Sequence, residues 1–345
     1  MNAVDEVRQV LGGLDPARAA PPCDDSRRGR VLALVLSDDR SADTARRAVP
    51  RRRLVLAAVG AVVVAAAGGG VAVSLYRQPE PAYAATPVML TYGPPMTAEP
   101  AGTRLRWLAA VAAQQPKPPR PAGTVEHLES TNWFLNSSIS GGRTVSAVVP
   151  QQWRSWRTDD DAGRMVKKDL PPIFRSEADR GQWTKWGGRV ESSEEVQDYA
   201  AGEFYSGFRG AVSTDVAALR GWLRADTSAP QAPVQYLEDI AQLAGVRLLN
   251  PAQRAAVLTF LADLPGITVT GTVTDRAGRT GEAFSIATDA HGLPAQHTVI
   301  VDSRSGALLG YEEVLTTTAG KLNVTLPAVI TYRSYLIAEY TAAPR

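Results

Sequence analysis

An uncharged run of 23 residues, from Leu54 to Tyr76, constrains the fold of this chain more than any other feature. As a helix with a rise of about 1.5 Å per residue, the run would be roughly 34 Å long, enough to cross a hydrocarbon core of about 30 Å. Arg51, Arg52 and Arg53 directly precede it, and arginines beside a membrane span tend to stay on the cytoplasmic side. We therefore expect a single transmembrane helix in the cell membrane, with a cytoplasmic N-terminus and an extracytoplasmic C-terminal part.

The main alternative to a retained signal-anchor is a cleaved signal peptide, with Ala82-Tyr83-Ala84 as the small-residue cleavage site. A signal peptide has a short charged N-terminal region and an apolar stretch shorter than a membrane span. Here the polar segment before the run has 53 residues and the run itself has 23. Both lengths favour a retained anchor.

The expected span divides the chain into a cytoplasmic tail of residues 1–53, a proline-rich juxtamembrane linker at 77–96 and an extracytoplasmic domain at 97–345. The tail carries 11 Arg, no Lys and 8 acidic residues. Its apolar residues are too few for a core of its own, so we expect a largely flexible segment with short helices. Two interpretations of the tail stay open: it binds a cytoplasmic protein partner, or it serves only to fix the topology.

Charge and cysteine content argue against nucleic-acid binding and exclude a disulfide within the extracytoplasmic domain. The whole chain has 37 basic and 35 acidic residues, without the strong basic excess of nucleic-acid-binding proteins. Cys23 is the only cysteine, so the extracytoplasmic domain has no internal disulfide and depends on its hydrophobic core. Arg outnumbers Lys by 32 to 5, a bias typical of high-GC bacterial genomes.

The first part of the extracytoplasmic domain is predicted to be one helix followed by strands. Apolar residues recur at helical spacing over 98–115 and then alternate with a period of two over 125–135, 144–149 and 152–158. The Asp-rich segment 159–163 suits a tight turn. The alternative to a turn is a calcium-binding loop, but the segment lacks the alternating acidic residues of an EF-hand. We expect 170–190 to form a long ordered loop.

Three helices and an antiparallel meander are predicted next. The helices cover about 215–224, 233–249 and 251–264, and Asn250-Pro251 is a well-specified start for the third. Strands follow at 267–274, 279–288, 297–301, 307–315 and 329–340, and two of the connections begin with Asp and end with Gly, as tight hairpin turns do. The predicted fold class is therefore α+β: an antiparallel sheet, in one interpretation curved into a half-barrel, packed against three to four helices.

Several blocks of sequence resemble an uncharacterised family of actinobacterial single-pass membrane proteins that are often encoded near extracytoplasmic-function sigma factors. The blocks are RSWRTDDDAGRMV, VSTDVAALRGWL, NPAQRAAVLTFLADLPGITVTGTVTDRAGRTG and VDSRSGALLGYEEV. The resemblance implies a strand-turn-strand near the start of the outer domain and carries over no catalytic residue. The pattern of sheet and helices also resembles, more distantly, the half-barrel of lipoprotein-sorting carriers and sigma-regulatory periplasmic proteins.

Histidines are scarce, and a metal site needs several ligands brought together. The chain has His127, His291 and His297. His291 and His297 flank a turn and can converge, but we expect a solvated surface pair and no metal site. The tail contains Cys23 and no histidine, which excludes the His/Cys zinc motif of zinc-binding anti-sigma domains.

Catalytic motifs are missing. The sequence has no G-x-S-x-G elbow and no phosphate-binding loop of the Walker or dinucleotide type. Glu194 and Glu195 are adjacent, so a helix or strand would point them in different directions, unlike the opposed carboxylates of glycosidases. We therefore expect no enzyme activity, no catalytic residue and no cofactor.

Tryptophan is concentrated within a stretch of 54 residues, which holds Trp133, Trp153, Trp156, Trp183 and Trp186. Aromatic rings can form a stacking platform or an apolar cavity for glycans, lipids or peptides. They can equally fill the core of a domain that has no disulfides. Both interpretations stay open, with these five side chains as the candidate binding residues.

The leading functional prediction is a membrane-anchored, non-catalytic binding or sensing protein that communicates the state of the cell envelope. Its partners would be the lipid bilayer, an envelope ligand and, through residues 1–53, a cytoplasmic protein. The alternative is a tethered carrier or chaperone for an apolar ligand such as a lipid or lipoprotein. A cell-wall-directed enzyme is the third candidate.

Overall fold

The computed structural model describes residues 83–343, except 141–142, 205–207, 209 and 224–230. The expected membrane span at 54–76, the arginines at 51–53 that were expected to fix its orientation, and the expected cytoplasmic tail lie outside the described residues. Within the part that is described, no helix combines the length and the apolar character needed to cross a membrane.

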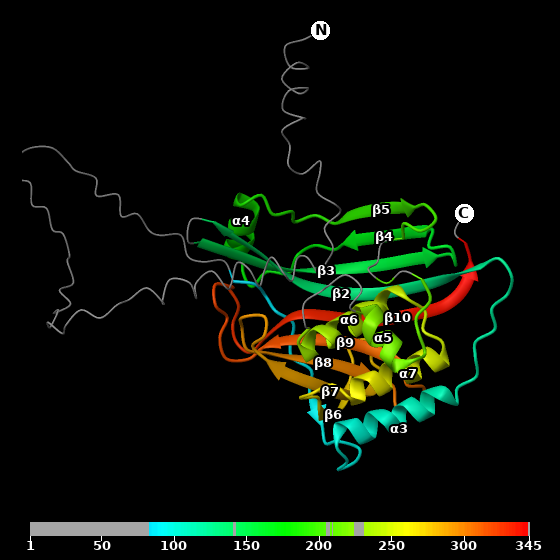
Figure 1. Cartoon of the computed structure of the whole chain (residues 1–345). Helices are drawn as coiled ribbons and strands as arrows, with labels where there is room; N and C mark the ends of the chain where they lie inside the picture. The colour runs from blue at the N-terminus through cyan, green and yellow to red at the C-terminus, as the bar shows by residue number, and fades with distance from the viewer. Residues whose placement is uncertain (1–82, 141–142, 205–207, 209, 224–230, 344–345) are drawn as a thin grey trace, which may run out of the picture.

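The described residues form an α+β domain with one large antiparallel sheet and five helices (Figure 1). The strands are β1 (Tyr92–Gly93), β2 (Thr124–Ser140), β3 (Arg143–Arg157), β4 (Gly163–Asp169), β5 (Ser193–Tyr199), β6 (Thr268–Thr274), β7 (Thr280–Thr288), β8 (Ala295–Val301), β9 (Leu308–Leu315) and β10 (Ala328–Ala342). Their order across the sheet is β1-β6-β7-β8-β9-β10-β2-β3-β4-β5. Two meanders are thus joined into one sheet by the pairing of β10 with β2.

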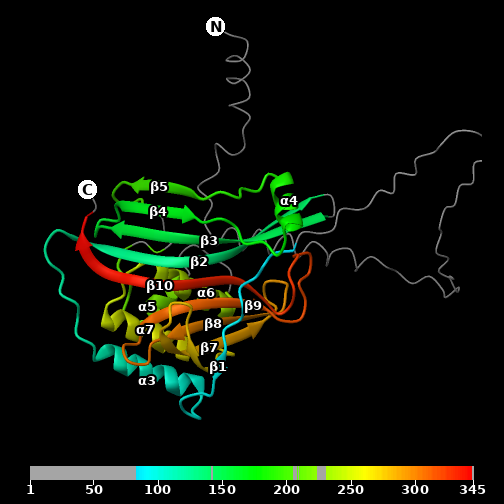
Figure 2. The same ribbon diagram turned by 180° about the vertical axis from the view of Figure 1, so that it is seen from behind.

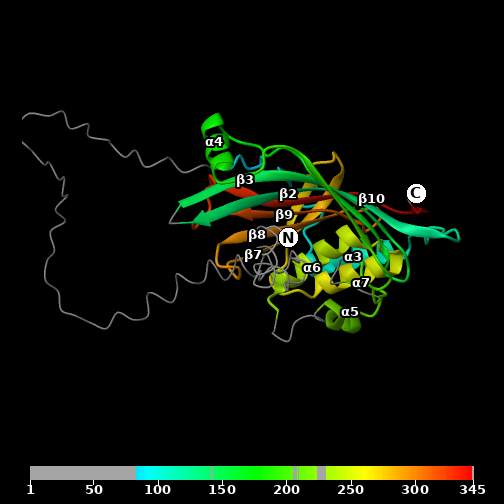
Figure 3. The same ribbon diagram turned by 90° about the horizontal axis from the view of Figure 1, so that it is seen from above.

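The helices are α3 (Ala101–Ala113), α4 (Glu177–Lys185), α5 (Val216–Leu223), α6 (Pro233–Val246) and α7 (Pro251–Ala262). Figure 1 shows α5, α6 and α7 in front of the β6 to β10 half of the sheet, and Figure 2 shows the same strands from behind. Seen from above in Figure 3, α3, α5, α6 and α7 lie together on one side of the sheet. The predicted fold class is confirmed at this level, with five helices among the described residues where three to four were expected.

The main hydrophobic core fills the space between these helices and the sheet. The apolar residues Leu237, Ile240 and Leu243 of α6 recur at helical spacing and are fully buried. They pack in one cluster with sheet residues such as Phe284 and Val299. The Tyr335 hydroxyl on β10 donates a hydrogen bond to the Ala241 carbonyl of α6, which adds a polar contact to this interface.

The segment before α3 covers the opposite face of the sheet. Leu90 and Tyr92 pack against a second apolar cluster that includes Val273 and Ile300. Arg276 donates a hydrogen bond to the Val88 carbonyl at 2.7 Å. Figure 2 shows this early segment, coloured cyan, running across the back of the strands. Both faces of the β6 to β9 meander are therefore covered.

The helix starts and turns that the sequence predicts are confirmed. The Asn250 side chain accepts a hydrogen bond from the Gln253 amide at 3.0 Å, and the Gln253 side chain accepts one from the Asn250 amide at 2.9 Å. In the hairpin turns, Gly278 and Gly306 have φ angles of 78° and 65°, which glycine adopts without steric cost.

Two predictions of local structure were wrong, and one strand was missed. The segments 144–149 and 152–158 belong to the single strand β3. Helix α4 lies inside the expected loop at 170–190, and its N-terminus is capped by Ser176, whose hydroxyl accepts a hydrogen bond from the Asp179 amide at 3.1 Å. Strand β5 was not expected. Helix α4 has no buried residue and β5 is mostly exposed, so neither has the apolar periodicity that identifies an element in the sequence.

Candidate functional site

Side chains from the helix layer and from the sheet meet in a polar cluster beneath α6. Glu238 comes from α6, His291 from the loop between β7 and β8, and His297 from β8. Glu238 Oε1 lies 3.4 Å from His291 Nδ1 and 3.2 Å from His297 Nδ1. The Tyr311 hydroxyl of β9 lies 2.8 Å from the same His297 nitrogen. We call these four residues the His-Glu cluster.

Strand register places further polar groups beside the His-Glu cluster. Directly paired residues of antiparallel strands point to the same face of a sheet. His297 pairs with Glu313 of β9, and Glu313 pairs with Thr331 of β10. In the neighbouring row, Tyr311 pairs with Arg333. The face of the sheet below α6 therefore carries acidic, basic and imidazole groups side by side.

The two histidine rings lie in different surroundings but contact each other. Their centroids are 5.7 Å apart and their planes are perpendicular. The His297 side chain is 1 % exposed, whereas His291 and Glu238 each keep 31 % of their side-chain surface exposed. The cluster thus has a buried histidine at its base and two side chains, Glu238 and His291, that solvent can reach.

Burial and the nearby charges shift the pKa values of the groups in and beside this cluster. Burial lowers the pKa of His297, and the nearby Glu313 opposes this shift. Burial raises the pKa of Glu313, His297 opposes the rise, and the Glu238 carboxylate adds to it. Burial likewise raises the pKa of Glu238, against the effect of His291 and Arg333. The pKa of the Tyr311 hydroxyl lies well above its ordinary value because of burial and of Glu238.

The atoms of this cluster suit metal binding. Glu238, His291 and His297 each offer a ligand atom, and the three atoms lie within 4.8 Å of one another. Among the described residues, this is the one group of three or more His, Cys, Asp or Glu side chains whose ligand atoms lie this close together. Two imidazole nitrogens with one carboxylate are typical ligands of zinc.

The expectation of a solvated surface pair of histidines was wrong for His297, which is buried. His291 and His297 do converge, as their flanking of a turn allowed. Glu238 was not predicted to join the two histidines, because it lies on a helix that precedes the whole C-terminal meander. A carboxylate bordering the buried stripe of an amphipathic helix is the one signal, and it is a common one.

The five candidate tryptophans do not form one surface. Trp153 is 8 % exposed and lies on the helix-facing side, where the Arg333 guanidinium is 5.6 Å from its ring. Trp133 and Trp156 point to the opposite face, because strand side chains alternate. Trp156 stacks on His127 with centroids 5.0 Å apart.

The remaining two tryptophans lie at α4. Trp183 is on this helix, and its indole nitrogen donates a hydrogen bond to the Arg189 carbonyl at 2.9 Å. Trp186 directly follows the last residue of the helix. The tryptophan-rich stretch is therefore distributed over two faces of the sheet and a peripheral helix.

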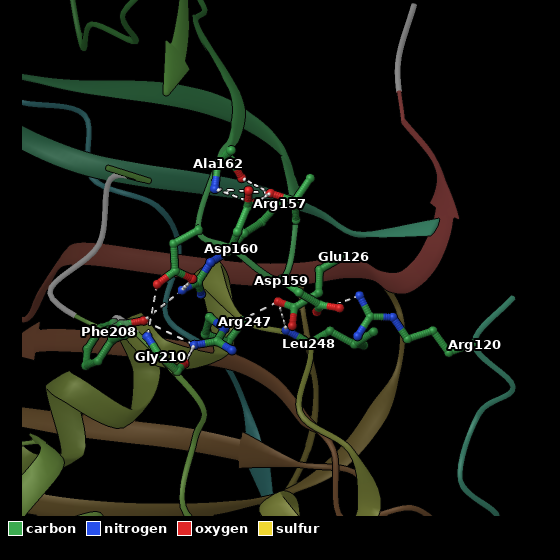
Figure 4. A network of polar contacts seen from close by, with 12 residues as sticks. Arg120, Glu126, Arg157, Asp159, Asp160, Ala162, Phe208, Gly210, Arg247 and Leu248 are labelled. Carbon is green, nitrogen blue, oxygen red and sulfur yellow. Dashed lines mark hydrogen bonds and ion pairs between the residues drawn. The ribbon is translucent and has the colours of Figure 1, made fainter. Parts of the chain in front are cut away.

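A second polar centre lies where β2 begins and β3 ends. It surrounds two buried arginines, Arg157 and Arg247 (Figure 4). Arg247 donates hydrogen bonds to the carbonyls of Phe208 and Gly210, at 3.1 and 2.6 Å, and to Glu126 at 3.3 Å. Arg157 contacts Asp161 and donates to the Phe208 carbonyl at 3.3 Å. Burial and the nearby Arg247 charge lower the pKa of Arg157. These contacts hold the backbone of Phe208 and Gly210 beside the sheet.

The carboxylates of the Asp-rich turn are used separately. Asp159 pairs with Arg120 at 2.6 Å, Asp160 accepts a hydrogen bond from the Thr158 hydroxyl at 2.5 Å, and Asp161 pairs with Arg157. Asp161 has a φ angle of 59°, a conformation that Asp and Asn tolerate in tight turns. The turn interpretation of this segment is confirmed.

The chain matches no family model, and neither a curated protein nor a solved structure matches it. The resemblance to the actinobacterial membrane family therefore stays a prediction.

Proposed function

We propose that the protein is a membrane-anchored, non-catalytic sensing module of the cell envelope, which binds its ligand at the His-Glu cluster and communicates occupancy to the cytoplasmic tail. In this proposal residues 54–76 span the membrane, the N-terminus is cytoplasmic and the described domain is extracytoplasmic. We also propose that the sheet is a curved half-barrel around its helices. The observation that carries the proposal is the position of the cluster between two layers of the fold.

A ligand at this position would contact both layers at once. Glu238 belongs to α6, whereas His297 and Tyr311 belong to adjacent strands of the sheet. Occupancy would therefore change how tightly α6 is held against β8 and β9. Differential contacts of this kind are what allow a ligand to shift a conformational equilibrium.

The filled core favours sensing over the carrier alternative. A carrier for an apolar ligand needs an open apolar cavity between sheet and helices. In this region Leu237, Ile240, Phe284 and Val299 are fully buried and belong to one continuous cluster. The partly exposed side chains of Glu238 and His291 at this interface are polar instead.

Replacement of the tail tests the signalling part of the proposal. In a strain that lacks the native gene, the full chain is compared with a chain in which residues 1–53 are replaced by an unrelated leader that keeps Arg51, Arg52 and Arg53. We expect both proteins to reach the membrane at equal levels. Only the full chain should reverse the phenotype that loss of the native gene causes. Full activity of the leader-swapped chain would count against signalling across the membrane.

Two biochemical measurements accompany this test. Membrane fractionation should find the full-length protein in the membrane, and a mature protein that starts near Ala85 in the culture supernatant would contradict the anchor. Native mass spectrometry of the protein released from detergent should show no co-purified lipid. A stoichiometric bound lipid would favour the carrier alternative.

A further inference from the structure

We infer that Glu238, His291 and His297 bind one divalent transition-metal ion, with zinc the closest match to their ligand atoms. The inference deepens the proposed function and rests on it for the biological role of the metal, but the site itself is argued from geometry alone. Three residues from three separate segments contribute one ligand atom each.

The two distances from Glu238 to the histidines agree with a tetrahedral zinc site. Zinc bonds to histidine nitrogen and carboxylate oxygen are about 2.0–2.2 Å long. In a regular tetrahedron with such bonds, two ligand atoms are about 3.3–3.6 Å apart. Glu238 Oε1 lies 3.4 Å from His291 Nδ1 and 3.2 Å from His297 Nδ1. Shifts of the side chains by a few tenths of an ångström at most would bring both Glu238–histidine distances into this range.

The ligand types favour zinc over calcium or magnesium. Calcium and magnesium prefer sets of oxygen ligands, whereas imidazole nitrogen suits zinc and other late transition metals. Two of the three ligands here are imidazoles. The cluster contains no thiolate, which agrees with a His₂Glu set.

The surroundings complete the site. The Tyr311 oxygen lies 2.8 Å from His297 Nδ1, so a metal ion on this nitrogen would have the Tyr311 oxygen beside its fourth coordination position. Glu313 is the direct cross-strand partner of His297 and adds a second carboxylate near the cation. Partners around the ligands of a metal site orient them and commonly alter affinity by about 10–100-fold.

The chain offers a matched control in His127. This histidine also lies between two carboxylates, with Nε2 3.3 Å from Glu129 and Nδ1 3.7 Å from Glu339. It differs in having no second imidazole within the group. If the measured zinc bound wherever a histidine meets carboxylates, His127→Ala would reduce binding as much as a change in the cluster.

The test uses the full-length protein in detergent, purified with a tag that contains no histidine and stripped of metal with a chelator. Zinc chloride is titrated by calorimetry, and the bound metal is counted by mass spectrometry after dialysis. We expect one zinc per chain and a rise in the thermal midpoint that chelator reverses, because a ligand that binds only the folded state stabilises it. Cobalt substitution should give the absorption spectrum of a tetrahedral site.

Three variants locate the site. His291→Ala is the main one, because this residue lies in a partly exposed loop and its loss leaves the core intact. It should weaken zinc binding by more than about 100-fold, beyond the usual effect of a residue around the ligands. Glu238→Gln should weaken binding comparably, whereas His127→Ala should bind as the unchanged protein does. Equal metal-free thermal midpoints in His291→Ala and the unchanged protein exclude misfolding as the cause of lost binding.

Two results would overturn the metal site: no stoichiometric zinc on the unchanged protein, or equal affinity in His291→Ala. Failure of the proposed function is seen separately, in the tail replacement. If zinc binds through the cluster while the leader-swapped chain keeps full activity, the site stands and signalling fails. If the tail is needed but zinc does not bind, the metal inference fails alone.

Discussion

Arg104 of α3 and Glu282 of β7 form a bidentate ion pair in the interior of the protein. Nε donates to Oε2 at 2.8 Å and Nη2 donates to Oε1 at 2.6 Å. The two side chains are 7 % and 2 % exposed, and 178 positions separate them in the chain. The pair thus fastens the first described helix to the C-terminal meander.

Removal of one member of this pair should destabilise the fold strongly. Arg104→Met leaves the Glu282 carboxylate buried without its partner, a change that typically costs about 3–5 kcal/mol. Urea unfolding of the full-length protein in detergent, followed by tryptophan fluorescence, measures the loss. The double variant Arg104→Met with Glu282→Met should be more stable than the single one, because it leaves no isolated charge.

The neighbouring residue Arg106 provides the control on the same helix. It pairs with Asp263, and the two side chains are 56 % and 44 % exposed. Exposed pairs contribute about 0–1 kcal/mol, so Arg106→Met should have little effect. Equal losses for Arg104→Met and Arg106→Met would show that burial does not control the strength of these pairs.

Substitution of two turn glycines separates backbone conformation from packing. An added Cβ at Gly306 would lie 2.6 Å from the Ala112 Cβ and 3.0 Å from the Leu258 Cδ1, whereas at Gly278 it would meet nothing within 4 Å. Gly278→Ala should cost about 1 kcal/mol for the left-handed conformation alone. Gly306→Ala should cost about 1–3 kcal/mol more, since it also overpacks the interface with α3 and α7. Thermal or urea unfolding of both variants checks this, and equal costs would contradict the packing account.

The capping residue of α7 should contribute a measurable share of stability. Asn250→Ala removes the side-chain acceptor for the Gln253 amide and should cost about 0.5–2 kcal/mol. Asn250→Asp keeps an acceptor and should retain most of the stability. The free energy of unfolding of the two variants, measured under the same conditions, decides the point. A loss in Asn250→Asp as large as in Asn250→Ala would argue against the cap.

The elements that the sequence predicted correctly are those specified by local chemistry. Asn250 followed by Pro251 marks a helix start within two residues, and the Asp and Gly positions of the hairpin turns lie within one connection. Burial also leaves a periodic pattern in α6 and in the C-terminal strands. Helix α4 and strand β5 have no such pattern because they bury almost nothing.

The candidate site depends on tertiary structure, so only part of it could be predicted from the residues alone. His291 and His297 are close in the chain, and their convergence was foreseeable. Glu238 joins them only because α6 packs across β8 and β9, and Glu313 only because the hairpin register pairs it with His297. The five tryptophans show the reverse case. They are close together in the sequence, but strand alternation and the separate position of α4 place them on different surfaces.

On the opposite face of the sheet, Glu312 offers a test of pH dependence. Its side chain is 1 % exposed and pairs with Arg276 at 2.8 Å. Burial raises the pKa of Glu312 above its ordinary value of 4.5, although Arg276 and the hydrogen bond from Tyr92 oppose the rise. Between the unfolded and folded pKa values, the folded state therefore binds more protons at this site than the unfolded state does.

This difference fixes the sign of the effect. The contribution of Glu312 to stability is fully present below pH 4.5 and is lost as the pH rises through the higher folded pKa. The Gln side chain of Glu312→Gln cannot titrate, so the variant does not lose this contribution. As the pH rises above 4.5, its free energy of unfolding should therefore increase relative to that of the unchanged protein. Urea unfolding across this range measures the trend, with Glu177→Gln, whose side chain is 87 % exposed, as a control for the loss of one charge. A difference that stays constant with pH, or one that moves the opposite way, would show that Arg276 compensates the buried carboxylate fully.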